Sequence, residues 1–391
     1  MRIVLAKGRS QYGSLRLHLD QLAAALAGLG HEAVVVDMLD VEGTRPLVEA
    51  LSAPTDAYFT FNGMGCEIAA TDYMRQSACV FASLYVDHPV HHLPRLSHDI
   101  ARQVVFFLDR SHVQFLAAWS GRRGFAHLGF LPPGANELEP PPDTSDAAFA
   151  RRDIPLLFTG TYRGPPSPGW TELPEGAAKA LLDETAERMA ADGRLALLDA
   201  VGAAAAARKA PLTPELLRGL APLLSAVQFY AEAFHRHVVL TALGEAGVAV
   251  EAHGKGWEAL AARYPGFRHC GEGSFEETLG LLRRARLVLN INNGFVAGGH
   301  ERVFTALAAG AGVFSESSRY YDESFTDEGP DREIATYPVH KPALIVPQLQ
   351  ALTADPQGLA AMARAGCAKA RAEHTWTARA AKIIAAIEAA R

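Results

Sequence analysis

A glycine-rich stretch at residues 287–315 holds the residue types best suited to bind an anion. Residues 287–291 are apolar and short enough for a strand, and three glycines follow that allow tight turns, Gly294, Gly298 and Gly299. Residues 300–309 then have helical spacing and end at Gly310, a common capping residue. The first N–H groups of such a helix are unpaired and lie at its positive dipole end. The stretch therefore predicts a phosphate-binding loop.

Polar side chains around this loop supply candidate ligand contacts. Arg302 can bind a phosphate through two N–H groups, and Glu301 can accept a hydrogen bond from a hydroxyl of a sugar or ribose. Thr305 is four residues after Glu301 and shares its helix face. Asn292 and His300 flank the loop, and we expect both to contact the same ligand. The alternative is an exposed ion pair at a helix start.

Two other turns of the second half are candidates for the same site. Gly160 ends an expected strand that begins at residue 154, and a further strand at 248–252 precedes Gly254, Lys255 and Trp257. Lys255 can neutralise a departing diphosphate. Trp257 can form a wall of the site, and buried packing is the equally simple alternative.

In the first half, Asp87 and His88 follow an apolar segment at residues 78–86. An imidazole titrates near neutral pH and is the usual group for removing a proton from a hydroxyl. We therefore expect Asp87 or His88 to act as a general base; the alternative is that Asp87 only caps the next turn. Residues in two other turns are candidates for binding the second substrate: Gly13, Ser14 and Asn62.

Composition excludes several classes of protein. The chain has 391 residues and a net charge of −6, so no overall basic field favours nucleic acid. No apolar run approaches the roughly 20 residues of a membrane span. Its four cysteines lack metal-ligand spacing and indicate free thiols in a reducing cytoplasm: Cys66, Cys79, Cys270 and Cys367. No Asp-x-Asp motif follows a strand, so we expect no metal at the site.

Strands and helices alternate through most of the sequence, which predicts parallel, doubly wound α/β sheets. The strands expected in the first half cover residues 3–6, 33–36, 57–61, 78–86 and 104–108. A proline-rich linker at 132–143 ends this half, and a helical insertion at about 171–234 interrupts the second. Strands resume at 248–252, 268–270, 287–291 and 313–314, and a last amphipathic helix begins at Thr375.

Several segments resemble the group 1 glycosyltransferases of the GT-B fold, and most of all their bacterial CgeB-like branch. Three of them lie at the loop: Leu-Asn-Ile-Asn (289–292), His-Glu-Arg-Val-Phe (300–304) and Ala-Leu-Ala-Ala-Gly (306–310). Three more are Ile-Pro-Leu-Leu-Phe-Thr-Gly (154–160), Val-Ala-Val-Glu-Ala-His-Gly-Lys-Gly-Trp (248–257) and His-Thr-Trp-Thr-Ala-Arg (374–379). The resemblance implies two Rossmann-like domains facing a cleft: 1–140 for the acceptor, 151–375 for the nucleotide sugar. Residues 376–391 are then a helix that crosses back to the first domain.

The resemblance implies transfer of a hexosyl or N-acetylhexosaminyl group from a nucleotide-diphosphate sugar to an acceptor hydroxyl. The acceptor is a glycan, a protein or a small molecule, and neither a metal nor another cofactor is expected. Many group 1 enzymes have two glutamates eight residues apart; the corresponding residues here are Ala297 and Thr305. That departure keeps two alternatives open: a nucleotide-sugar epimerase of the same fold, and a non-catalytic sugar- or nucleotide-binding relative.

Overall fold

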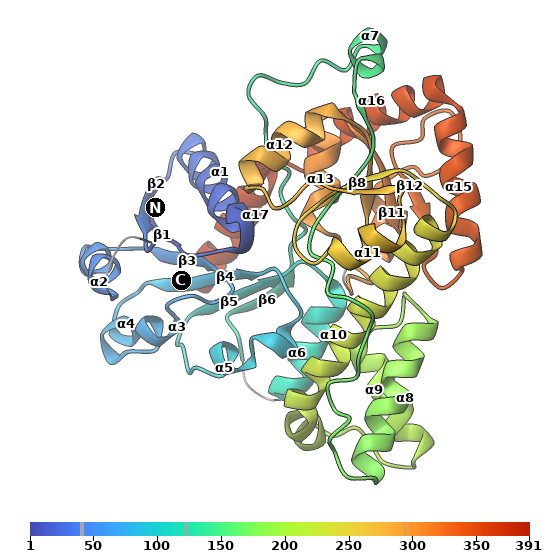
Figure 1. The fold of residues 1–391 in the computed structure, drawn as a ribbon. Coiled ribbons are helices and arrows are strands. Elements are labelled where there is room, and N and C mark those ends of the chain that lie inside the picture. Colours follow the sequence, from blue (N-terminus) through green and yellow to red (C-terminus); the bar gives the residue numbers. More distant parts are fainter. Residues whose placement is uncertain (40–42, 122–123, 293) are drawn as a thin grey trace. The chain divides into compact units, whose positions relative to one another are not determined.

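The computed structural model describes residues 1–39, 43–121, 124–292 and 294–391, and the chain divides into two compact units (Figure 1). Unit 1 comprises residues 1–136 and 373–391, and unit 2 comprises residues 137–372. The divisions therefore fall at 136/137 and 372/373, a few residues before the domain ends expected at 140 and 375.

Unit 1 is built on a parallel sheet of six strands in the order β2-β1-β3-β4-β5-β6. Its strands are β1 (Arg2–Lys7), β2 (Glu32–Asp37), β3 (Ala57–Phe61), β4 (Val80–Tyr85), β5 (Gln103–Phe107) and β6 (His127–Phe130). Every residue of β3, β4 and β5 is buried, because helices cover both faces of a doubly wound sheet. The α/β fold predicted for this half is confirmed.

The helices of unit 1 come from both chain segments that form it. They are η1 (Gln11–Gly13), α1 (Ser14–Gly28), α2 (Arg45–Ser52), α3 (Cys66–Ala69), α4 (Asp72–Gln76), η2 (Pro89–His91), α5 (Leu93–Leu96), α6 (Arg110–Ser120) and α17 (Trp376–Ala390). Helix α17 packs against α1 (Figure 1). Its Trp376 ring meets His18 of α1 at 5.4 Å and Phe61 of β3 at 6.0 Å between centroids. The last helix thereby completes the core of the first unit.

Unit 2 contains a second parallel sheet of six strands, in the order β12-β11-β10-β7-β8-β9. Its strands are β7 (Ile154–Thr159), β8 (Val250–His253), β9 (Phe267–His269), β10 (Ala285–Asn290), β11 (Gly312–Glu316) and β12 (Ala335–Tyr337). The helices outside the insertion are α7 (Asp146–Ala150), α11 (Glu258–Arg263), α12 (Phe275–Arg284), α13 (Glu301–Ala308), α14 (Arg319–Ser324), α15 (Pro342–Ala354) and α16 (Pro356–Glu373). This half also has the predicted class of fold.

The helical insertion consists of α8 (Ala177–Ala191), α9 (Leu197–Ala207) and the long α10 (Pro214–Glu245). Figure 1 shows α8 and α9 beside α10. Helix α10 continues beyond the predicted limit of 234, because Val239, Leu240 and Leu243 are buried in the core of the sheet. The same helix therefore belongs to the insertion and to the α/β core. Within the described residues, no helix is both long and apolar enough to cross a membrane.

Candidate functional site

Arg302 stands at the start of α13 and reaches back to the carboxyl ends of β7 and β10. Its Nη1 donates to Asn290 Oδ1 at 2.8 Å, and its Nε donates to Thr159 Oγ1 at 3.3 Å. The guanidinium also lies 5.1 Å from the centroid of Phe158, and the residue is only 8% exposed. Burial lowers the pKa of Arg302 from its usual value. Arg302 is therefore a buried, oriented cation, and not the exposed ion-pair partner of the alternative interpretation.

A second buried guanidinium, from Arg236 of α10, lies on the other side of the same turn. Arg236 Nη1 donates to Thr161 O at 2.6 Å, two residues after the Thr159 that Arg302 contacts. Burial, with a further contribution from the charge of Arg302, lowers the pKa of Arg236 to about 10. The two cations thus flank Gly160. A Cβ atom at Gly160 would lie 3.1 Å from Arg302 Nη2, so glycine leaves this position open.

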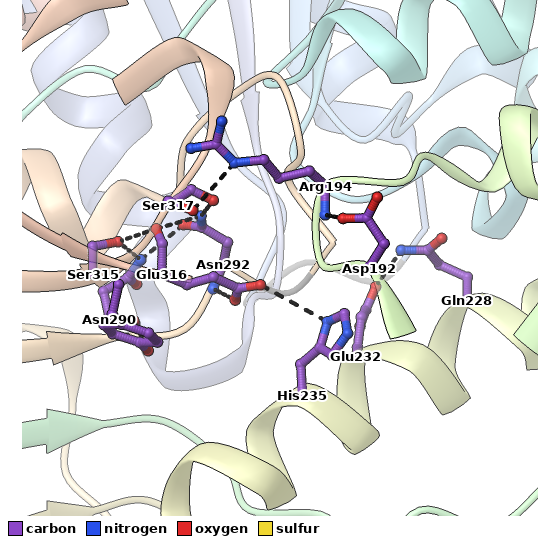
Figure 2. Close-up of polar contacts among 11 residues, drawn as sticks. Asp192, Arg194, Gln228, Glu232, His235, Asn290, Asn292, Ser315, Glu316 and Ser317 are labelled. Carbon is purple, nitrogen blue, oxygen red and sulfur yellow. Dashed lines mark hydrogen bonds and ion pairs between the residues drawn. The ribbon is translucent and has the colours of Figure 1, made fainter. Parts of the chain in front are cut away.

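Glu316 ends β11 and is a buried acidic group of this region (Figure 2). Its Oε2 accepts the backbone N–H of Asn292 at 2.8 Å, and its Oε1 lies 3.8 Å from His235 Nδ1. Burial raises the pKa of the Glu316 carboxyl to about 7, opposed by the bond from Asn292 and the charge of Arg236. For the neighbouring His235 imidazole, by contrast, burial lowers the pKa. A carboxyl group that titrates near neutral pH can exchange a proton with a ligand hydroxyl or phosphate.

Asn292 orients this carboxylate and does not face outward as a ligand contact. It is 1% exposed, and its amide donates to Glu316 O at 2.8 Å. Its Oδ1 accepts from Asn290 Nδ2 at 2.9 Å and from Tyr321 Oη at 3.0 Å. The predicted direct contact with a ligand is therefore replaced by a supporting role. Arg194, from the loop after α8, adds a bond to Ser317 Oγ at 3.3 Å beside Glu316 (Figure 2).

His300 caps helix α13 and contacts Glu301. Its Nδ1 lies 3.2 Å from the backbone nitrogen of Arg302 and 2.7 Å from Glu301 Oε2. One nitrogen cannot accept from an N–H and donate to a carboxylate at once, so these two bonds belong to different tautomers. Burial lowers the pKa of His300, which favours a neutral ring. The Glu301 side chain, 29% exposed, is the more accessible of the two groups.

The glycines after β10 pack against the protein. A Cβ at Gly299 would lie 2.8 Å from the Tyr321 ring, and Gly298 O accepts from Ser318 Oγ at 2.7 Å. Neither has a positive φ angle, unlike Gly294 at +82°. On these sides α14 and its N-cap approach Gly298 and Gly299, and their close approach to a ligand stays a prediction.

Two further predicted donor contacts lie inside the core. Trp257 is fully buried and donates from Nε1 to Gly160 O at 2.8 Å, so it holds the Gly160 turn and forms no wall of an open site. Thr305 is 1% exposed, and its contact with a ribose stays a prediction. Both side chains are buried because they pack inside unit 2.

Gly254 and Lys255 lie next to the Gly160 turn. A Cβ at Gly254 would lie 2.3 Å from Gly160 O, and Gly254 has a φ of +135° that favours glycine. Lys255 O accepts from the N–H of Tyr162 at 2.9 Å, and the exposed Lys255 ammonium pairs with Glu272 at 3.4 Å. Lys255 thus has an exposed cationic side chain on a backbone held beside Gly160.

Unit 1 has a separate polar cluster after β3 and β4. Asp87 Oδ2 lies 3.4 Å from Asn62 Nδ2 and 3.4 Å from His92 Nε2, and the Asp87 side chain is 58% exposed. Asn62 adopts a φ of +52° and accepts the N–H of Val86 at 2.9 Å, which fixes it beside Asp87. Asp87 and Asn62, both predicted, are therefore brought together with His92.

His88 does not join this cluster. It is 5% exposed, its Nδ1 accepts the N–H of Val90 at 3.1 Å, and its ring packs 4.5 Å from His112 and 4.7 Å from Phe115. Burial places its pKa well below the usual value. The prediction of His88 as a base is wrong, because the ring is a neutral helix cap inside the core.

The remaining candidates of unit 1 lie in the turn before α1. Gly13 has a φ of +83° with no atom within 4 Å of a Cβ built on it, and Ser14 is the first residue of α1. The turn is open to solvent, and its role in acceptor binding stays a prediction.

Comparison with known proteins bears on the fold. Residues 234–385 match the family model described as glycosyl transferase-like, and no curated protein sequence matches the chain. Sucrose-phosphate synthase from Thermosynechococcus elongatus is 12% identical with a TM-score of 0.59, and 98% of each chain is covered. AviGT4, a glycosyltransferase involved in avilamycin A biosynthesis, is 16% identical with a TM-score of 0.52, over 99% of this chain and 97% of that one.

A third solved structure, HepE of Anabaena in complex with UDP, is 11% identical with a TM-score of 0.54, over 99% of this chain and 100% of that one. At these identities the likeness shows the fold. The chain therefore has the GT-B fold, and its match to the glycosyl transferase-like family model lies in residues 234–385.

Proposed function

We propose that the protein transfers a sugar from a nucleotide-diphosphate donor to an acceptor hydroxyl, with the donor bound by unit 2. The observation that carries this proposal is the pair of buried guanidiniums, Arg302 and Arg236, on either side of Gly160. Two buried like charges repel each other, and a diphosphate bound at this turn would relieve that repulsion. HepE and an α-glucosyltransferase of the same fold were both solved with UDP, which favours a uridine nucleotide as the first donor to test.

Each group has a distinct task in the proposed reaction. Arg302 and Arg236 stabilise the negative charge that develops on the departing diphosphate, and Lys255 can add to it from the surface of the turn. Glu301 or Glu316 accepts a hydrogen bond from a hydroxyl of the donor. Asp87, supported by His92 and Asn62, takes the proton of an acceptor held by unit 1. These roles require no metal ion. A hexosyl or N-acetylhexosaminyl donor and the CgeB-like branch are the finer parts of the proposal, and rest on the sequence segments.

Calorimetric titration with UDP, GDP and ADP tests donor binding directly. We expect Arg302→Ala to weaken binding of the preferred nucleotide by about 10- to 150-fold, as loss of a charged hydrogen bond of roughly 1.5–3 kcal/mol implies. Arg218→Lys is the matched control, because Arg218 belongs to the same unit but pairs with Glu215 on the surface. Unchanged affinity in an Arg302→Ala protein with a wild-type circular dichroism spectrum would disprove the site.

Product analysis separates transfer from its rivals. The protein is incubated with the preferred nucleotide sugar, with and without a panel of glycan, peptide and small-molecule acceptors. Sugar appearing on an acceptor supports transfer. An isomerised donor in the absence of acceptor identifies an epimerase, and tight binding with no turnover identifies a non-catalytic relative.

A further inference from the structure

Three side chains with metal-binding atoms converge on one face of the unit 2 sheet, at the edge strand β9 and its neighbour β8. Glu251 and His253 alternate along β8 and so point to the same side. The register pairs Glu251 with Arg268 and Ala252 with His269, and the N–H of Cys270 continues this ladder by donating to Ala252 O at 2.9 Å. Cys270 therefore lies beside His253, on the face that carries Glu251.

The three side chains offer a carboxylate oxygen, an imidazole nitrogen and a sulfur atom, all within 4.8 Å of one another. Glu251 Oε1 and His253 Nε2 are already 3.0 Å apart, and their side chains are 13% and 16% exposed. The opposite face of β8 is core, with Val250 and Ala252 fully packed. The cluster thus has a rigid base and an open outer side.

We propose that Glu251, His253 and Cys270 form a binding site for a zinc-like divalent cation. This set of donor atoms matches the preference of Zn²⁺ for nitrogen, sulfur and carboxylate ligands. Ligand atoms around tetrahedral zinc lie about 3.2–3.8 Å apart. The 3.0 Å between Glu251 Oε1 and His253 Nε2 is close to this range, and the Cys270 sulfur lies within 4.8 Å of both. Binding would form a metal–sulfur bond and release the thiol proton to solvent, with no change of oxidation state. A fourth position would remain for water.

Arg268 is the internal competitor for this site. Its Nη2 lies 3.1 Å from Glu251 Oε2, and its Nε lies 3.3 Å from Cys270 Sγ. Its side chain is 73% exposed, so the guanidinium can swing into solvent when a cation takes its place. Removing Arg268 should therefore strengthen metal binding. If the ion pair between Arg268 and Glu251 were only structural, its removal would bring no such gain.

A second group of possible ligands, Cys66, Glu67 and His98 in unit 1, is a poorer candidate. The Cys66 residue is fully buried, and burial raises the pKa of its thiol to about 11. A metal requires the thiolate, so binding there would oppose the environment of the sulfur. Cys66 is for this reason a useful control residue.

Cobalt titration of the full-length protein, stripped with a chelator and kept reduced, tests the proposal without any substrate. We expect one Co²⁺ per chain with a thiolate-to-cobalt charge-transfer band, displaced by Zn²⁺. Cys270→Ser should abolish the band, and His253→Asn should weaken binding by more than about 100-fold, beyond the loss typical of an outer hydrogen-bond partner. Arg268→Ala should tighten it, and Cys66→Ser should leave it unchanged.

The opposite results overturn the proposal. These are absence of Co²⁺ and Zn²⁺ binding by the wild-type protein in equilibrium dialysis, or a charge-transfer band that survives in Cys270→Ser. A band lost in Cys66→Ser alone places the metal in unit 1 and also rejects the site. Failure of nucleotide binding leaves this experiment unaffected, since its readout is the metal alone.

Discussion

Replacing Glu316 by glutamine should stabilise the folded protein at alkaline pH and change little at acidic pH. Burial raises the pKa of the folded carboxyl to about 7, against 4.5 for the unfolded side chain. Between these values the folded state keeps a proton that the unfolded state has lost. The free energy of unfolding of the wild type therefore falls as pH rises through this window and levels off above it, while the contribution is fully present below pH 4.5.

The size of the effect follows from the same two values. The difference, 7 − 4.5, is 2.5 pH units, which at 1.36 kcal/mol per unit corresponds to about 3 kcal/mol. The charge of Arg236 already opposes this shift, and burial keeps the neighbouring His235 neutral in the upper part of the range. Glutamine retains an oxygen for the Asn292 N–H and is neutral at every pH of the experiment.

Urea unfolding at pH 5 and pH 8, followed by far-ultraviolet circular dichroism without nucleotide, measures the difference. The measured quantity is the free energy of unfolding of Glu316→Gln minus that of the wild type. We expect this difference to be larger at pH 8 than at pH 5, by up to about 3 kcal/mol. Glu172→Gln, at an exposed position of the same unit, should show no such dependence. A Glu316→Gln protein whose stability difference from the wild type is the same at both pH values would refute the reasoning.

Three further outcomes are expected. Transfer should persist in EDTA, because the proposed chemistry uses Arg302 and Arg236; complete loss that added metal reverses would contradict this, and Cys270→Ser would show whether the metal acts at β8–β9. Asp87→Asn should lower turnover by about 10²- to 10⁴-fold and leave calorimetric nucleotide affinity intact; near-normal turnover removes Asp87 from the mechanism. Gly254→Ala should lower the free energy of unfolding in urea more than Gly271→Ala does. Both glycines have a positive φ, but only at Gly254 would a Cβ lie within 2.3 Å of Gly160 O. Equal losses would show that the backbone strain accounts for the whole effect and the close contact for none of it.

Periodicity was sufficient for the elements that are long or fully apolar. The strand at 57–61 matches β3, and the helix expected at 300–309 matches α13 within a residue at each end, because their apolar spacing has one interpretation. The three-residue β12 was missed, since so short a segment carries no period. The extension of α10 to Glu245 depends on burial against the sheet, which local spacing does not record.

The candidate site was less predictable than the fold. Strand ends directed attention to the right edge of the sheet, and the same rule applied to β11 would also have indicated Glu316. Arg236 gave no local signal, because it lies within a helix and contacts Thr161 across 75 residues of sequence. The direction of each side chain was the other limit: His88 and Trp257 follow β4 and β8, and Thr305 lies on α13, but all three are buried.

The separation of residues 373–391 from the rest of unit 1 has a consequence for biosynthesis. Unit 2 is one uninterrupted segment, so it can fold as soon as residue 372 has left the ribosome. The first unit is synthesised earlier but must wait for α17, whose Trp376 fills the space between His18 and Phe61. The core of the first unit is therefore completed only after the whole of unit 2 has been synthesised. During that interval the apolar surface that α17 later covers is exposed to chaperones and to aggregation.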